Sequence, residues 1–191
     1  METYSVSVVI PTYNRATLLR RALKSALGSL RHDDEIIVVD DGSTDDTREV
    51  VAEYGNRLVY VQNQHGGAGK ARNTGIDRAT KPLIAFLDSD DEWMPGAFEL
   101  KRRLLSARPD VVYCFSNFAV CFENEKKRRY LDRWHENHPL LTTSFSGPLN
   151  WDRLMGPAAK FLRLRRCRRE TTIRSSTLET STPRNSLAFT F

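Results

Sequence analysis

Short apolar runs alternate with helical apolar spacings along the first 115 residues of the chain. The five runs are rich in β-branched residues, as buried strands of a parallel sheet are, and they occupy residues 6–10, 35–39, 58–61, 83–87 and 111–115. Leucine and alanine recur at helical spacing over residues 18–30, and shorter helical patterns fill the later intervals. This alternation predicts a doubly wound α/β fold, with a mostly parallel sheet flanked by helices.

Mostly polar residues follow directly on the first, second and fourth runs. They are Pro11, Thr12, Tyr13, Asn14 and Arg15 after the first run, Asp40 and Asp41 after the second, and Asp88, Ser89 and Asp90 after the fourth. In the usual strand order 3-2-1-4 these ends meet where the order reverses, which is where open α/β sheets bind ligands. Carboxylates crowded there repel one another unless a cation or a hydrogen-bonding ligand lies among them. This mixture suits a nucleoside diphosphate with a divalent cation, because it offers a ring for the base, donors for phosphate and hard oxygens for the metal.

A glycine-rich loop follows the third run. Residues 65–69 are His-Gly-Gly-Ala-Gly, but Lys70 precedes Ala71 rather than Ser or Thr, so this is not a Walker loop. No G-x-G-x-x-G pattern follows the first run, which argues against a nicotinamide or flavin dinucleotide site. With Lys70 and Arg72, the loop either approaches a pyrophosphate or forms a plain strand-to-helix turn. The glycines alone do not decide between these two interpretations.

Chain length and cysteine content indicate the number of domains and the cellular compartment. A chain of 191 residues favours one domain with a sizeable core. Cys114, Cys121 and Cys167 lack metal-site spacing and cannot all pair, which favours reduced thiols in the cytoplasm. The opening residues carry no basic segment of a signal peptide, and no apolar run approaches the ~20 residues that cross a bilayer. We therefore expect a cytoplasmic protein that could also work at the inner face of the membrane.

The net charge of +5 is unevenly distributed. Residues 1–125 contain 15 Lys and Arg against 19 Asp and Glu, whereas residues 126–191 contain 14 against 5. A basic tail could bind nucleic acid, anionic lipid or an acidic partner, but we favour a solvated segment and expect no nucleic-acid partner. Ten of the 21 residues in 171–191 are Ser or Thr with almost no apolar pattern, which predicts disorder. Association with a membrane surface through the tail remains open.

Four segments in the first 91 residues resemble, in order, the motifs of inverting glycosyltransferase family two, which has the GT-A (Rossmann-like) fold. They read VVIPTYNR at 8–15, IVVDDGSTD at 37–45, GAGKARNTG at 67–75 and FLDSDD at 86–91. The resemblance covers roughly residues 5–120 and implies a nucleoside-diphosphate sugar as donor, of uridine or thymidine type. It also implies a glycan, lipid-linked or protein acceptor, and a place in cell-wall or polysaccharide biosynthesis.

The same resemblance implies roles for individual residues. Pro11, Tyr13 and Arg15 would line the nucleotide pocket, with Thr12, Asn14 and Ser89 beside them, and Asp41 would bond a uracil-type base. Arg72 would lie near the pyrophosphate. Asp88 and Asp90 would form the Asp-x-Asp motif for Mg²⁺ or Mn²⁺, Asp90 more directly. The metal would neutralise charge on the departing diphosphate, and a general base would take the proton of the attacking acceptor hydroxyl.

The second half of the sequence departs from the family. We expect a donor-binding core over residues 1–125, a partial, basic acceptor-side region over 126–170 and a disordered tail over 171–191. The general base is unknown because the later acids, Asp132, Glu136, Asp152, Glu170 and Glu179, form no acidic motif of the family type. This departure predicts a truncated or frame-shifted product. The alternative function is therefore a non-catalytic remnant that binds only a nucleotide diphosphate.

A third hypothesis comes from another class of protein. Phospho-signalling receivers also gather aspartates at strand ends, but they carry an acidic pair on the first strand. Here the first run ends in Pro-Thr-Tyr-Asn, so a receiver is disfavoured.

Overall fold

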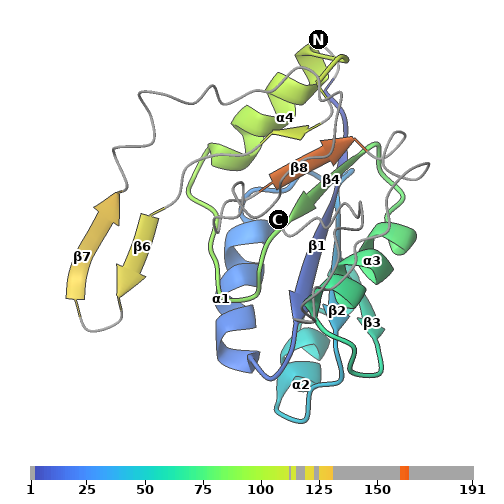
Figure 1. Ribbon diagram of the computed structural model, residues 1–191, viewed down its shortest axis with the longest axis vertical. Helices are drawn as coiled ribbons and strands as arrows, with labels where there is room; N and C mark the ends of the chain where they lie inside the picture. Colours follow the sequence, from blue (N-terminus) through green and yellow to red (C-terminus); the bar gives the residue numbers. More distant parts are fainter. Residues whose placement is uncertain (1–2, 112, 115–118, 123–124, 131–159, 164–191) are drawn as a thin grey trace, which may run out of the picture.

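The computed structural model describes residues 3–111, 113–114, 119–122, 125–130 and 160–163. Its main sheet has six strands in the order β3-β2-β1-β4-β8-β5 (Figure 1). The first four strands along the chain are mutually parallel, and they are β1 (Val6–Thr12), β2 (Glu35–Asp40), β3 (Val59–Gln62) and β4 (Leu83–Phe86). The predicted order 3-2-1-4 is confirmed, so the strand order reverses between β1 and β4.

The sheet continues beyond β4 with a strand from much later in the chain. Strand β8 (Lys160–Arg163) runs antiparallel between β4 and β5 (Tyr113–Cys114). The sequence pattern predicted a fifth strand over residues 111–115, of which Tyr113 and Cys114 are described as strand, but it did not predict β8. Strands β6 (Ala119–Phe122) and β7 (Glu125–Tyr130) form a separate antiparallel pair. The expected disordered tail at 171–191 lies outside the described residues.

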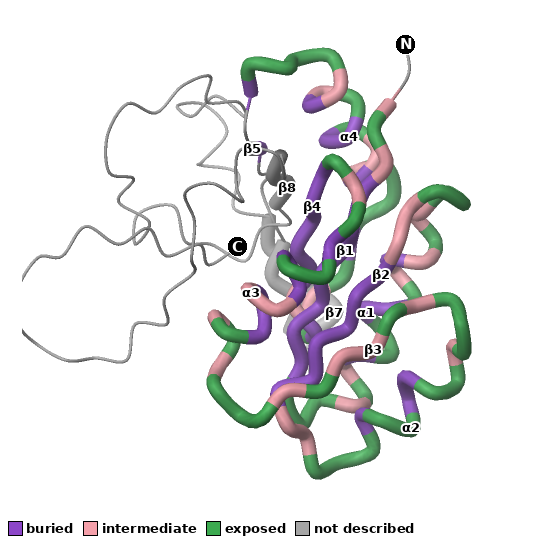
Figure 2. Tube along the Cα trace, turned by 90° about the vertical axis from the view of Figure 1, so that its right-hand side faces the viewer, coloured by how far each residue is buried: buried purple, intermediate pink, exposed green. Residues whose placement is uncertain are grey.

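Helices cover both faces of the parallel strands. They are α1 (Ala16–Leu27), α2 (Thr47–Ala52), α3 (Ala68–Arg78) and α4 (Ala97–Ala107), with a 3-10 turn at Gly55–Arg57. Apolar side chains of α1, α2 and α4 form one core with the even-numbered residues of β1 and β2, and α3 packs on β1 and β2. All seven residues of β1 are buried, as expected for a parallel strand covered on both faces (Figure 2). No helix in the described ranges is long and apolar enough to cross a membrane.

Helix α3 lies very close to β1 because of a glycine. A Cβ atom at Gly75 would lie 2.2 Å from Cγ1 of Val9, so any larger residue would push the helix off the sheet. Arg72 is three residues earlier on the same helix and is almost completely buried. The glycine of the ARNTG segment therefore sets the depth at which the arginine meets the sheet.

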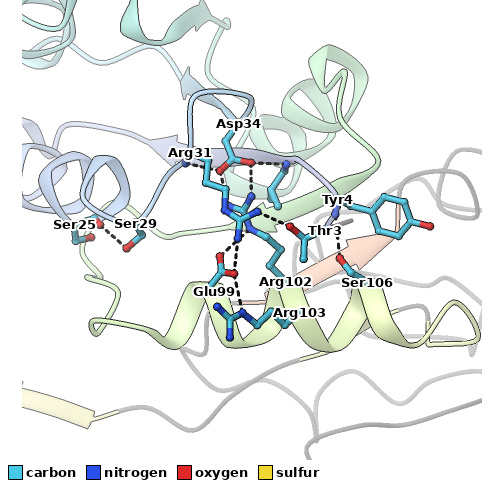
Figure 3. A network of polar contacts seen from close by, with 11 residues as sticks. Thr3, Tyr4, Ser25, Ser29, Arg31, Asp34, Glu99, Arg102, Arg103 and Ser106 are labelled. Carbon is cyan, nitrogen blue, oxygen red and sulfur yellow. Dashed lines mark hydrogen bonds and ion pairs between the residues drawn. The ribbon is translucent and has the colours of Figure 1, made fainter. Parts of the chain in front are cut away.

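A buried ion pair lies at the end of the sheet where the parallel strands begin (Figure 3). The side chains of Asp34 and Arg102 are both fully buried. The Asp34 carboxylate accepts hydrogen bonds from the backbone N–H groups of Val6 and Arg31, and from two nitrogens of Arg102. Glu99 pairs with Arg102 and with Arg31. The network thereby ties α4 to the start of β1 and to the loop before β2.

Candidate functional site

The loops after β1, β2, β3 and β4 meet at the carboxyl edge of the sheet. Backbone bonds extend the strand ladder into these loops: Asp41 N–H donates to Thr12 O (2.9 Å), Asn63 N–H to Asp40 O (2.8 Å) and Leu87 N–H to Val9 O (3.1 Å). The sequence-predicted site residues are consequently brought to one edge. The fold achieves this because consecutive parallel strands all end on the same side.

Asp88 is paired with the arginine of α3. Nη2 of Arg72 lies 2.5 Å from Asp88 Oδ1, and only 6% of the arginine side chain is exposed. Nε of Arg72 is buried and has no hydrogen-bond partner among the described residues. Asp88 balances the charge of this guanidinium, and a phosphate group that took the place of the carboxylate would meet a charged donor there.

Asp90 is paired with the arginine of the loop after β1. Nη1 of Arg15 lies 2.6 Å from Asp90 Oδ2, and about half of each side chain is exposed. The two aspartates of the Asp-x-Asp segment thus each hold a guanidinium, which relieves the crowding of negative charge. Between them, Ser89 is buried, so it is placed to support the loop more than to contact a ligand.

The donor set fits a divalent cation only when a ligand contributes to its coordination. Among the described residues, no group of three or more His, Cys, Asp or Glu side chains is arranged to hold a metal. Mg²⁺ and ions like it need no complete protein cage, because they bind through one or two carboxylates plus substrate phosphates and water. Asp88 and Asp90 match that pattern. A cation shared with phosphate groups is therefore compatible with this edge.

Asp41 anchors the glycine-rich loop. Its buried carboxylate accepts hydrogen bonds from the N–H groups of Gly66 (3.1 Å) and Gly67 (2.7 Å), and Nδ1 of His65 lies 3.0 Å away. Gly67 has a φ of +88°, a conformation that favours glycine, and it immediately precedes α3. The loop amides thus point at Asp41, and the bonding of Asp41 to a base stays a prediction.

Two aromatic rings stack at the outer side of this loop. The ring centroids of Tyr13 and His65 are 4.3 Å apart at an interplanar angle of 32°. Both side chains are exposed, so aromatic surface is accessible beside Asp41. His65 is not among the site residues that the sequence predicts. Its position directly before the glycines was the available signal that it lies near the site.

Asn14 connects the loop after β1 to the loop after β2. Its N–H donates to Ser43 Oγ (2.9 Å), and its Oδ1 accepts from the backbone N–H of Thr44 (2.8 Å). Ser43 and Thr44 are residue types that often cap helices, but neither caps the second helix. Helix α2 begins after Asp46, which makes no side-chain cap bond, while the neighbouring Asp45 carboxylate accepts hydrogen bonds from the N–H and the hydroxyl of Thr47.

Asp40 and Thr12 lie beneath these loops. The Asp40 carboxylate accepts from Ser43 N–H (2.8 Å) and from the hydroxyl of Tyr60 (2.6 Å). Burial, together with the bond to Asp40, raises the pKa of Tyr60. Thr12 is buried and its hydroxyl has no hydrogen-bond partner among the described residues, while Pro11 is buried within β1. Asp40 therefore connects the loop after β2 to Tyr60 of β3.

The five later acids considered as a general base lie outside the described residues.

Comparison with known proteins identifies the family. The model of glycosyl transferase family 2 matches residues 7–168. An uncharacterized glycosyltransferase of Rickettsia prowazekii is 37% identical over 112 residues, which cover 57% of this chain and 35% of the relative. The GalNAc(5)-diNAcBac-PP-undecaprenol beta-1,3-glucosyltransferase of Campylobacter jejuni is 35% identical over 130 residues, which cover 65% and 41%. The chain thus spans less than half the length of these relatives.

Solved structures agree with the family match. TarS 1-349 of S. aureus in complex with UDP-GlcNAc is 32% identical, with a TM-score of 0.52 over 56% of this chain and 33% of that one. A second structure of this fragment reaches a TM-score of 0.64 over 86% of this chain and 48% of that one, at 24% identity. The mannosyltransferase PcManGT of Pyrobaculum calidifontis, in complex with GDP-Man and Mn²⁺, is 29% identical, with a TM-score of 0.53 over 59% and 35%. The chain therefore belongs to glycosyl transferase family 2 and has the GT-A fold.

Proposed function

We propose that this chain binds a nucleoside-diphosphate sugar and serves its transfer, with inversion, to an acceptor hydroxyl. The observation that carries the proposal is the pairing of both Asp-x-Asp carboxylates with arginines, Asp88 with Arg72 and Asp90 with Arg15. Two cations and two anions at one sheet edge match a ligand that carries its own negative charge and a shared metal. Membership of the family supports the reaction class.

The donor would lie across the loops that follow the parallel strands, with its base and its phosphates at different residues. Its base would occupy the surface formed by Tyr13 and His65, with Asp41 beside it. Its phosphates would lie near the arginines, because guanidinium groups bind phosphate oxygens in pairs of parallel hydrogen bonds. For the donor to bind at this edge, Arg15 and Arg72 must each bond a phosphate in addition to the paired aspartate, or in place of it.

Asp88 and Asp90 would hold Mg²⁺ or Mn²⁺ together with the donor phosphates. When bound, the ion supplies neutralisation of the charge that develops on the departing diphosphate. The chain's own part is to orient the diphosphate, which is what the two arginines are placed to do. The Mn²⁺ present in the PcManGT complex supports this choice of metal.

A uridine-type donor and a lipid-linked acceptor are favoured. TarS, whose structures contain UDP-GlcNAc or UDP, supports the uridine type. The undecaprenol diphosphate in the name of the Campylobacter jejuni relative supports the acceptor class. Residues 1–125 would form the donor-binding core and residues 126–170 a partial acceptor side, and no general base is assigned.

The proposal is tested by calorimetric titration with UDP, dTDP, GDP and ADP, each with and without Mn²⁺. We expect Mn²⁺-dependent binding that favours the uridine or thymidine compound, and its loss in Asp90→Ala. Asp110→Ala is the matched control, because Asp110 forms a similarly exposed pair with Arg108 outside the candidate site. Equal binding by wild type and Asp90→Ala would refute the metal-assisted site.

A further inference from the structure

We infer that Asn14 is a positioning residue, which presents Tyr13 and Arg15 to the two halves of the donor by clamping its loop to residues 43–44. The inference rests on the proposed function and assigns Asn14 a role different from direct ligand contact. It starts from the backbone. Asn14 has a φ of +50°, and it is the only described residue other than glycine with a positive φ.

The left-handed conformation separates two side chains that have different tasks. On one side of Asn14, the ring of Tyr13 stacks on His65. On the other side, the guanidinium of Arg15 reaches Asp90. Rotation of Asn14 into the extended region would turn the flanking peptide groups and displace both side chains from His65 and Asp90. Asparagine tolerates this conformation better than most residues, but it still needs local support.

That support comes from two bonds to the loop after β2. The N–H of Asn14 donates to Ser43 Oγ, while the side-chain oxygen of Asn14 accepts from the N–H of Thr44. A third bond follows, in which the N–H of Ala16 donates to Asp45 Oδ2 (2.9 Å). The β1 loop is thus bonded to the β2 loop on both sides of Arg15. The carboxamide oxygen of Asn14 is used within the protein, which is the reason for assigning it to positioning.

The first arm of the test uses the nucleotide-free protein and NMR. The ring current of Tyr13 should change the chemical shifts of the His65 ring protons. We expect this contribution to be lost in Asn14→Ala and in Ser43→Ala. Asn14→Asp should retain it, because aspartate keeps an acceptor oxygen and tolerates the left-handed region. Asn14→Gly should lose part of it, since glycine keeps the backbone conformation without the acceptor. Unchanged His65 resonances in both alanine variants would overturn the inference.

The second arm measures nucleotide affinity with Mn²⁺. We expect Asn14→Ala to weaken UDP binding about tenfold and Ser43→Ala by about threefold. The double variant should lose less than the product of the two effects, because both act through one clamp. Multiplicative losses, or weaker UDP binding in Asn14→Ala with an intact Tyr13–His65 contact, would indicate direct contact with the ligand and overturn the inference.

Ser106→Ala is the matched control for general stability. Ser106 Oγ accepts from the N–H of Tyr4 (3.0 Å), the same type of bond as that of Ser43 but near the start of β1. It should change neither the His65 resonances nor UDP affinity. If the wild type binds no nucleotide at all, the proposed function fails, while the NMR arm still decides the role of Asn14.

Discussion

The buried guanidinium of Arg72 bonds Asp88 at 2.5 Å, so a helix residue fixes the first carboxylate of the Asp-x-Asp segment. Arg72 reaches it from α3, a helix that Gly75 allows to lie directly against Val9 of β1. The pair thus connects the packing of the helix on the sheet with the geometry of the site. Stability and ligand binding should both respond when it is broken.

We expect Arg72→Ala to lower the free energy of unfolding by about 2 kcal/mol and to weaken binding of UDP with Mn²⁺. The estimate lies below the ~3–5 kcal/mol found for fully buried pairs, because Asp88 retains some contact with solvent. Urea denaturation and calorimetry provide the two measurements. Arg78→Ala, an exposed arginine at the end of the same helix, should change neither quantity. An Arg72→Ala protein of unchanged stability would contradict the structural part of this account.

Removing the Arg15 side chain should have opposite effects on the affinity for Mn²⁺ alone and on the affinity for UDP with Mn²⁺. The guanidinium of Arg15 competes with a cation for Asp90, so Arg15→Ala should bind Mn²⁺ alone a few-fold more tightly. The same variant should bind UDP with Mn²⁺ more weakly, since it lacks a phosphate donor. Titrations of Mn²⁺ and of UDP measure the two effects, with Arg20→Ala as a control that removes an exposed pair with Glu53. A loss of affinity for Mn²⁺ alone would show that Arg15 does not compete for Asp90.

Breaking the Asp34–Arg102 pair should affect stability alone. Asp34→Ala leaves a buried guanidinium and two backbone donors without their acceptor, so we expect a loss of about 3 to 5 kcal/mol. Affinity for UDP should stay unchanged under conditions in which the variant is folded, because this network lies where β1 and β2 begin, whereas the candidate site lies where they end. Denaturation, together with titration below the melting temperature, checks both expectations. Asp33→Ala, which removes an exposed neighbouring acid, is the control.

Glu35 should make stability sensitive to acid. Burial alone would raise the pKa of its carboxyl, but hydrogen bonds from Ser7 and Thr80 outweigh burial, and the net pKa lies below the ordinary 4.5. Its contribution to stability is therefore present above pH 4.5 and is lost as the pH falls through the lower, folded-state pKa. Glu35→Gln should reduce the loss of stability in that window. Identical pH profiles for the variant and the wild type would contradict this assignment.

The strands of the parallel sheet and the convergence of their ends could be predicted because both are encoded locally. Apolar runs stop at Pro11, Asp40 and Asp88, and the topology of parallel strands brings those ends together. Strand β8 could not be predicted in this way. Its four residues lie in an Arg-rich segment, and their pairing with β4 and β5 depends on tertiary contacts.

Side-chain partners within the site were harder to predict than its location. Ser43 and Thr44 have the composition of helix caps, yet Asn14 engages both. Asp41 is a natural ligand for a base, yet it also holds the amides of the glycine loop. In each case a partner distant in the sequence competes with the local preference, and only the three-dimensional arrangement decides which bond forms.

A divalent cation and a nucleoside diphosphate should bind together between Asp88 and Asp90. The most direct measurement is paramagnetic broadening of backbone amide resonances by substoichiometric Mn²⁺, with and without UDP. We expect UDP to strengthen the broadening at Ser89 and Asp90, while Val6 and Asp34 at the opposite edge remain sharp. Broadening that is unaffected by UDP, or that centres away from residues 88–90, would contradict the account.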